Sequence, residues 1–460
     1  MGSRFKIRSF CDFMLSGYPS RLWYLREIIF SKTFKQVTKL VEPLGQILSE
    51  ASHLDSLEIA RCDWFLENYP GLVDAIVSNH HIKSLRLIKA GDQALQFLRR
   101  ICSPLTSVTV LLTPECVDGP VPSIALGLSK FSKTLLEINV RNFLFAAHLT
   151  VYTYPNVTSL TIEESDVRMP VFMPMFPQLR ELSIFCFCSR FAPLDDEMDT
   201  IHADSKAWQA AQGEATRWRF LERLEGDVHS LFRLAPTCKI RLLSSILTSQ
   251  NVHRFTQLCR DTQPDTLKVY FHSDKLQAHE LEDVIQASSQ LRSISITVDA
   301  MGMISEMDFS SIFVHFRRML HLTAVHTLYI RLTYHAGDDL SAAESDSSYA
   351  PDSDDEDENG ALEDEDDSAD EAEEEAVINS LLEAHRPNTP DSVKRYLAGL
   401  DVDAVIERCA RDIPTLRYAC FDKPNSPLAY FEVFRHEDGG TFSWIRLSHA
   451  VGEKIMANLC

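Results

Sequence analysis

Histidine and acidic residues are the side chains of this sequence that come nearest to a catalytic spacing. His279 and Glu280 begin like the helix of a zinc peptidase, but Asp283 stands where that motif needs its second histidine. His80 and His81 are adjacent, so they cannot share one face of a helix or strand as two ligands of one metal would. Neither the GxxxxGK(S/T) phosphate loop nor the GxSxG nucleophile elbow occurs.

These absences predict a protein that is not an enzyme and that needs neither a cofactor nor a metal. A hydrolase without a recognisable motif stays open as an alternative, because Ser/His/Asp catalysis depends on proximity in three dimensions rather than on spacing.

The eleven cysteines are scattered along the chain, and their number is odd. No CxxC pair occurs, and Cys186 and Cys188, two residues apart in a predicted strand, have no second pair to complete a metal site. Most cysteines lie in apolar stretches, where a free thiol packs as a small hydrophobe. We therefore expect a reducing compartment, either the cytoplasm or the nucleus.

The formal net charge of −21 belongs to one segment rather than to the whole chain. Residues 338–375, the acidic tract, contain 20 Asp and Glu and no Lys or Arg, which leaves 46 acidic and 45 basic residues elsewhere. Because the rest of the chain is nearly neutral, it lacks the excess of basic residues that is typical of nucleic-acid-binding proteins, and no nucleic-acid partner is expected. No apolar run reaches the roughly 18 residues of a membrane span, and no membrane partner is expected either.

The composition of the acidic tract predicts disorder, because so few apolar residues cannot offset the entropy lost on ordering. Its serines lie among or just ahead of acidic residues, the context that acidophilic kinases prefer, and each phosphate would add about −1.5 to −2 charges. The candidate phosphorylation sites are Ser341, Ser345, Ser347, Ser348 and Ser353.

A short pattern, apolar-x-x-apolar-x-apolar, recurs along the rest of the chain. Leu54-Asp-Ser-Leu57-Glu-Ile59 is a typical copy. The alternation in its last three positions predicts a strand with one buried face. The middle apolar positions, here called the middle anchors, are Ile28, Leu57, Leu85, Val108, Ile138, Leu160 and Leu182, then Ile294 and Leu328, with weaker copies at 221–224, 239–242 and 266–271.

The first seven middle anchors lie 22 to 30 residues apart, close to the roughly 20–29 residues of a leucine-rich repeat. Helix-like stretches such as residues 66–77 lie between them. One strand and one helix cannot bury their apolar faces alone, whereas stacked copies can. The spacing therefore predicts an α/β fold, an irregular leucine-rich-repeat-like solenoid with a curved parallel sheet and outer helices. An ordinary α/β domain with similar strands is the alternative.

Breaks in the pattern give the predicted organisation. The solenoid spans residues 1–331, with an irregular insertion or long loop at 189–217 that becomes helix-prone around Ala207–Ala211. The acidic disordered insertion spans 332–390. Residues 391–460 are expected to form the last repeat and a C-terminal cap packing on the solenoid. The predicted elements of this part are a strand at 416–421, a hairpin of 430–435 and 441–447 around Glu437-Asp-Gly-Gly440, and a short helix at 451–459. Such a cap would cover the open sheet edge.

Residues between and just beyond the apolar anchors should point to the concave face of such a sheet. Most of these residues are expected only to be exposed to solvent. Arginine and tyrosine are over-represented at binding hot spots, so the candidate partner contacts are Arg86, Asn139, Arg141, Tyr270, Tyr329 and Arg331. Charge reversal at Arg141 and Arg331 together is expected to weaken partner binding and to leave the melting temperature almost unchanged.

The chain resembles the F-box proteins of mushroom-forming fungi, which carry a large, irregular leucine-rich-repeat-like region. The residues that carry the resemblance are Phe10-Cys-Asp-Phe13 with Tyr24-Leu-Arg-Glu-Ile28, Trp218–Asp227 leading to Leu231-Phe-Arg-Leu234, Leu416-Arg-Tyr, and the last hairpin with Trp444 before Leu447-Ser448. The resemblance implies a substrate-recognition region of an SCF ubiquitin ligase receptor that binds a protein partner.

The F-box itself, a short helical module with Leu-Pro near its start that docks a Skp-type adaptor, is not evident. The nearest candidate, Tyr18-Pro-Ser-Arg-Leu22, runs into the first repeat. Either the chain is a truncated member of the family or it keeps the recognition array without the adaptor module, and an adaptor is expected only if an F-box lies outside the readable pattern. A scaffold or orphan repeat protein with no ligase link is the alternative.

Overall fold

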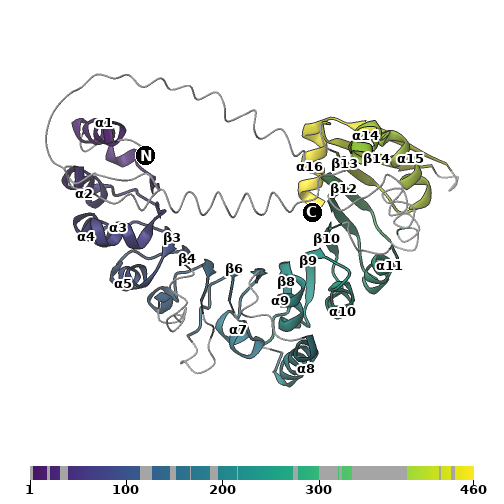
Figure 1. The fold of residues 1–460 in the computed structure, drawn as a ribbon, viewed down its shortest axis with the longest axis horizontal. Coiled ribbons are helices and arrows are strands. Elements are labelled where there is room, and N and C mark those ends of the chain that lie inside the picture. Colours follow the sequence, from purple (N-terminus) through teal and green to yellow (C-terminus); the bar gives the residue numbers. More distant parts are fainter. Residues whose placement is uncertain are drawn as a thin grey trace. The chain divides into compact units, whose positions relative to one another are not determined.

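The computed structural model (Figure 1) describes the residues in fifteen ranges: 4–17, 21–31, 40–113, 127–143, 145, 152–165, 167–186, 195–214, 216–272, 278–299, 320, 324–333, 391–423, 426–436 and 441–459. The acidic tract, with its predicted disorder and its five candidate phosphorylation sites, lies outside them.

The fold is α/β, with a long, open and mostly parallel sheet whose fifteen strands follow the order of the chain. This confirms the predicted class and the predicted parallel sheet. The strands are β1 (Glu27–Phe30), β2 (Ser56–Ile59), β3 (Ser84–Ala90), β4 (Ser107–Leu112), β5 (Glu137–Arg141), β6 (Ser159–Glu163), β7 (Glu181–Phe185), β8 (Phe220–Asp227), β9 (Lys239–Leu247), β10 (Thr266–His272), β11 (Ser293–Asp299), β12 (Thr327–Thr333), β13 (Tyr418–Asp422), β14 (Ala429–Arg435) and β15 (Phe442–Leu447).

The chain forms two compact units. The first comprises residues 1–246, 251–268 and 287–291, and the second comprises residues 247–250, 269–286 and 292–460. Each is described separately below.

The middle anchors of the first unit stand side by side in the sheet. Each pairs in parallel register with the next, in the order Ile28, Leu57, Leu85, Val108, Ile138, Leu160, Leu182 and Leu224. All eight side chains are buried. The recurring apolar position in the sequence is therefore one continuous row of the core.

Helices return the chain from the end of one strand to the start of the next, and in Figure 1 they lie on one side of the strands of the first unit. They are α1 (Arg4–Ser16), the short 3-10 helix η1 (Leu22–Tyr24), α2 (Val41–Glu50), α3 (Cys62–Asn68), α4 (Pro70–Ser78), α5 (Asp92–Arg100), η4 (Ser129–Phe131), α7 (Met169–Met175), α8 (Asp195–Ala211), α9 (Val228–Leu234) and α10 (Val252–Thr262). Helix α5 is typical, since it buries Ala94, Leu95, Phe97 and Leu98 on one face.

One helix takes its N-terminal cap from the preceding copy of the repeat. Helix α5 has Gly91 at its N-cap position and no capping side chain of its own. The carboxylate of Asp63, on α3, instead accepts hydrogen bonds from the backbone N–H groups of Gly91 (2.7 Å), Gln93 (3.2 Å) and Ala94 (3.1 Å). Since the first N–H groups of a helix have no partner within it, this contact joins two successive copies.

The predicted irregular insertion at 189–217 is wrong over most of its described part. Residues 195–211 form the 17-residue helix α8, which packs on α9. The buried residues of α8 include Met198, His202, Ser205 and Gln209. A helix whose buried face is largely polar has no apolar stripe, and the sequence pattern therefore missed most of its length.

The second unit contains strands β11 to β15 with helices α11 (Ala278–Ala287), α14 (Asp391–Gly399), α15 (Val402–Asp412) and α16 (His449–Leu459). Strands β11, β12 and β13 are parallel, and β13, β14 and β15 are antiparallel. The predicted pairing of 430–435 with 441–447 and the predicted final helix are both present. The turn at 437–440 lies outside the described residues.

Helix α16 covers the face of β14 opposite to the one that contacts α15. Arg435 of β14 donates a hydrogen bond to the carbonyl of Ile413 (2.6 Å), just after α15, and another to that of Ala410 within it. Tyr430 is an odd number of residues away, so it points to the other face, where Gly452 of α16 lies against its ring: a β-carbon at Gly452 would stand 2.1 Å from Cγ of Tyr430. Only glycine permits this approach.

Candidate protein-binding surface

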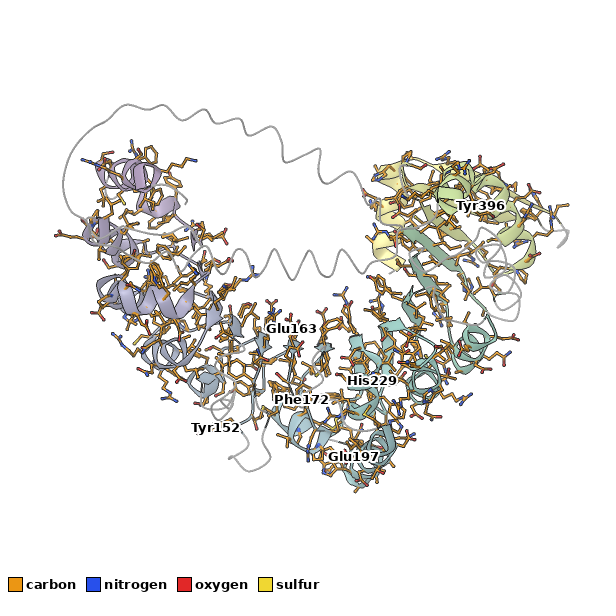
Figure 2. All side chains as sticks on the ribbon, viewed as in Figure 1. Tyr152, Glu163, Phe172, Glu197, His229 and Tyr396 are labelled. Carbon is orange, nitrogen blue, oxygen red and sulfur yellow. The ribbon has the colours of Figure 1, made fainter. Side chains whose placement is uncertain are left out.

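The residues that alternate with the buried anchors form one face of the sheet in the first unit, on the side away from the helices. This surface is called the strand face here. Its central row, in parallel register, consists of Ile29, Glu58, Arg86, Thr109, Asn139, Thr161, Ser183, Glu225 and Ser244. In Figure 2, Glu163 lies on this side of the strands and Glu197, on α8, lies on the other.

Two of the predicted contact residues of the first unit already have an acidic neighbour. Arg86 forms an ion pair with Glu58 of the adjacent strand (Nη1–Oε2, 3.3 Å). Arg141 does the same with Glu163, its register partner on β6 (Nε–Oε2, 2.7 Å). The arginine side chains are 53% and 43% exposed, so each guanidinium can be reached by a partner, but its charge is balanced locally.

The third predicted residue of this unit, Asn139, lies between Thr109 and Thr161 in the central row. Its side-chain Oδ1 is buried and accepts no hydrogen bond from the described residues. A buried acceptor without a donor is costly, so this position would gain from a donor brought by a partner.

Carboxylates that the sequence analysis did not single out give the strand face its net charge. Glu27, Glu137, Glu181 and Glu225 form no ion pair within the described residues. Glu27 accepts a hydrogen bond from Ser56 (3.3 Å), Glu181 from Ser159 (3.4 Å) and Glu225 from Ser244 (3.3 Å). Beside them lies one arginine without an ion pair in the described part, Arg223, opposite Glu181. The strand face of the first unit is therefore acidic.

In the second unit, the structure brings Tyr270, Tyr329 and Arg331 together. Asp422 of β13 accepts hydrogen bonds from Tyr329 Oη (3.2 Å) and from Arg331 Nε (2.7 Å), and Tyr270 is near enough to Arg331 to interact electrostatically. Burial, and then the charge of Asp422, raise the pKa of Tyr329. The tyrosine therefore stays a neutral hydrogen-bond donor over the working pH range.

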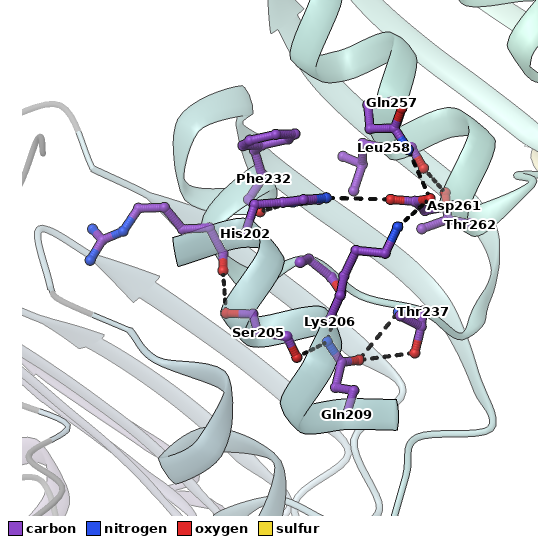
Figure 3. Close-up of polar contacts among 12 residues, drawn as sticks. His202, Ser205, Lys206, Gln209, Phe232, Thr237, Gln257, Leu258, Asp261 and Thr262 are labelled. Carbon is purple, nitrogen blue, oxygen red and sulfur yellow. Dashed lines mark hydrogen bonds and ion pairs between the residues drawn. The ribbon is translucent and has the colours of Figure 1, made fainter. Parts of the chain in front are cut away.

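A cluster that resembles catalytic machinery lies among the helices of the first unit (Figure 3). Nε2 of His202 lies 3.5 Å from Oδ2 of Asp261, and Nδ1 lies 2.7 Å from the carbonyl of Phe232. Nζ of Lys206 is 2.8 Å from Oδ1 of Asp261. Ser205, one turn along α8, donates its hydroxyl proton to the carbonyl of Arg233 instead (2.9 Å).

His202, Lys206 and Asp261 are together called the polar clamp here. Both ring nitrogens of His202 face acceptors, and its ring stacks on that of Phe232 with 3.9 Å between the ring centres. Burial would raise the pKa of Asp261, but hydrogen bonds from His202 and Lys206 more than offset this and lower it. The arrangement joins α8, α9 and α10 and presents no serine to the histidine, so it supports the packing of these helices.

The thiols of the buried cysteines are poor nucleophiles. Burial raises the pKa of Cys11 to about 11 and that of Cys238 and Cys259 to about 12, and it raises the pKa of Cys62 well above its ordinary value. Since the thiolate is the reactive form, these four residues pack as hydrophobes, as expected from their apolar surroundings in the sequence.

Among the described residues, no group of three or more His, Cys, Asp or Glu side chains could hold a metal ion. None of the helices in the described ranges has both the length and the apolar character needed to cross a membrane. A scan against models of known protein families found no match, and a search of curated proteins found none either.

Proposed function

We propose that this chain is a non-enzymatic protein-binding solenoid of the leucine-rich-repeat-like type, and that its strand face is the binding surface. The observation that supports this most strongly is the acidic strand face of the first unit, a regular surface of half-exposed side chains on strands whose other side is fixed by the core. Rigid, regularly spaced positions lower the ordering cost of binding. A partner with basic residues fits this surface.

The C-terminal elements act as the cap of the solenoid in this proposal. Strands β14 and β15 change the sheet from parallel to antiparallel, which ends the repeat. Helix α16 then covers the face of β14 that would otherwise continue the strand surface.

The binding surface can be tested by reversing two of its carboxylates. Glu137→Lys with Glu225→Lys is expected to weaken binding of a basic partner by about tenfold or more, since each substitution replaces an attraction with a repulsion. The melting temperature should change little, because neither glutamate has an ion pair in the described part of the chain. The partner is captured with the wild-type protein, identified and purified, and its affinity is then measured by calorimetry.

The matched control is Glu42→Lys with Glu67→Lys, which makes the same change in net charge on helices α2 and α3, where both residues are exposed. The control should bind like the wild type. Equal affinity of the strand-face variant and the wild type would move the binding site away from this surface.

In this proposal Arg141 remains a partner contact, but its guanidinium is shared between the partner and Glu163. Reversing Arg141 would remove its attraction for a partner carboxylate and also break its ion pair with Glu163. Exposed pairs contribute about 0.2–1 kcal/mol, so the expected effect on stability stays small.

The link to ubiquitin ligases is a further part of the proposal and rests on the resemblance to fungal F-box proteins. Helix α1 contains the Phe10–Phe13 stretch, and Phe13 is 58% exposed, so an apolar contact is available at this end of the first unit. Affinity purification of the full-length protein, with detection of a Skp-type adaptor and a cullin, tests the link. Their absence would leave a scaffold without a ligase role, in the cytoplasm or nucleus, and activity-based hydrolase probes address the enzyme alternative.

A further inference from the structure

A cleft of about 630 Å³ lies where strands β7 and β8 of the first unit begin. It is lined by residues 177–180 ahead of β7, by residues 217–220 ahead of and at the start of β8, and by Glu222. The volume falls in the range of ligand sites, about 300–1,000 Å³. None of the strand-face carboxylates named above is among the lining residues, and the lining carries a net positive charge.

Three guanidinium groups line the cleft against a single carboxylate. Nη1 of Arg180 pairs with Oε1 of Glu222 at 3.3 Å, and both side chains are well exposed. Arg219 is exposed and has no hydrogen bond or ion pair with any described residue. Two positive charges of the cleft are therefore not neutralised by protein carboxylates.

The third guanidinium, that of Arg217, is held in place by the end of helix α8. Its Nε donates a hydrogen bond to the carbonyl of Gln212 (3.0 Å), and its Nη2 donates one to that of Ala210. A guanidinium has five N–H donors in a rigid plane, so donors remain for a ligand. A pre-oriented arginine loses less entropy when it binds an oxyanion.

The segment that carries these arginines is anchored in the core. Trp218, between Arg217 and Arg219, is 5% exposed, and its Nε1–H donates a hydrogen bond to the carbonyl of Phe176 (2.8 Å). Its ring also packs edge-on against Phe172 at 5.8 Å. At the other end of the segment, Phe220 remains 40% exposed and offers an apolar contact beside the charges.

We propose that this cleft binds an acidic peptide segment that carries phosphoserine. Arginine forms bidentate, charge-assisted hydrogen bonds with phosphate and carboxylate, and the exposed ring of Phe220 suits a peptide better than a free anion. Two sources share this chemistry: the chain's own acidic tract, with its 20 acidic residues and six serines, and an acidic segment of another protein. This proposal does not require that the strand face binds a partner.

The test uses a fluorescent synthetic peptide of residues 338–358 of this chain, phosphorylated on Ser345, Ser347 and Ser348, and the full-length protein. Anisotropy titrations compare the wild type, Arg219→Glu and the control Arg408→Glu, an exposed arginine on α15 that is outside the cleft and makes the same charge change. The phosphopeptide should bind the wild type and the control equally. It should bind Arg219→Glu at least about tenfold more weakly, the loss expected for one charged hydrogen-bonding partner.

Cleavage of the acidic tract by a glutamate-specific protease, after phosphorylation of the full-length chain by an acidophilic kinase, distinguishes the two sources. If the chain's own tract occupies the cleft, cleavage should be faster in Arg219→Glu than in Arg408→Glu, and the added peptide should bind the phosphorylated wild type more weakly than the unphosphorylated wild type. If the ligand comes from another protein, the cleavage rates should be equal and the added peptide should bind. Equal cleavage together with no difference in peptide binding among the three proteins would overturn the proposal.

Discussion

Replacing Leu160 by Ala should lower the free energy of unfolding by about 2–5 kcal/mol. Leu160 is 1% exposed and pairs in register with Ile138 on one side and Leu182 on the other. The truncation therefore opens a cavity in the middle of the continuous apolar row, where neighbours on both sides are fixed by their strands. Urea unfolding followed by circular dichroism measures the loss.

The matched control is Thr161→Ala on the same strand, whose side chain points to the strand face. Away from the core, such a substitution should change stability by no more than about 0.5 kcal/mol. Similar losses for the two variants would mean that the two faces of β6 are not the core and surface described above.

Replacing Asp261 by Ala should lower the free energy of unfolding by about 3 kcal/mol. The substitution leaves the largely buried His202 and the partly exposed Lys206 without their shared carboxylate. Because the pKa of Asp261 is lowered in the folded state, its stabilising contribution is complete above the pKa of the unfolded chain, about 3.9. It is lost as the pH falls through the lower folded value.

The difference in stability between wild type and Asp261→Ala should therefore be full at pH 7 and shrink below about pH 4. Chemical unfolding at a series of pH values measures this difference. Asp261→Asn, which keeps the shape of the side chain and removes its charge, should show a smaller loss at pH 7. A difference that stays constant from pH 7 to pH 3 would mean that the charge of Asp261 does not hold the polar clamp together.

Much of this fold was predictable because it repeats. The alternating apolar residues of each copy can face only one side of a strand, and the near-constant spacing of the middle anchors implies parallel neighbours. The register of Leu57 with Leu85, or of Ile138 with Leu160, follows directly from that. The β14–β15 hairpin was predictable from a local turn signal between two strand-like runs.

Helix α8 and the position of α16 were not predictable in the same way. The buried side of α8 contains His202, Ser205 and Gln209, whose burial is possible only because carbonyls of α9 and its neighbourhood satisfy them, and such partners are distant in the sequence. The position of α16 depends on the close contact between Gly452 and the ring of Tyr430, which is also a contact between residues distant in the sequence. Local periodicity carries no information about either.

The composition of the strand face was predicted only in part. The positions between the anchors were placed correctly, but the residue types were weighed by hot-spot frequency, which favours arginine and tyrosine. The structure shows Arg86 and Arg141 paired with neighbouring glutamates, whereas Glu137 and Glu225 form no ion pair with any described residue. A comparison of charges across the predicted register would have found this.

Photo-crosslinking from defined positions tests the central claim, that the strand face binds a protein partner. A photoreactive amino acid is placed at Thr109 or Thr161 on the strand face, or at Glu42 or Glu67 on the outer helices, and cross-linked proteins are identified by mass spectrometry from cells. One and the same protein should be captured from both strand-face positions and from neither helix position, and its capture should fall when Glu137 and Glu225 are reversed. Capture of that protein from the helix positions alone, or equally from all four, would contradict the account.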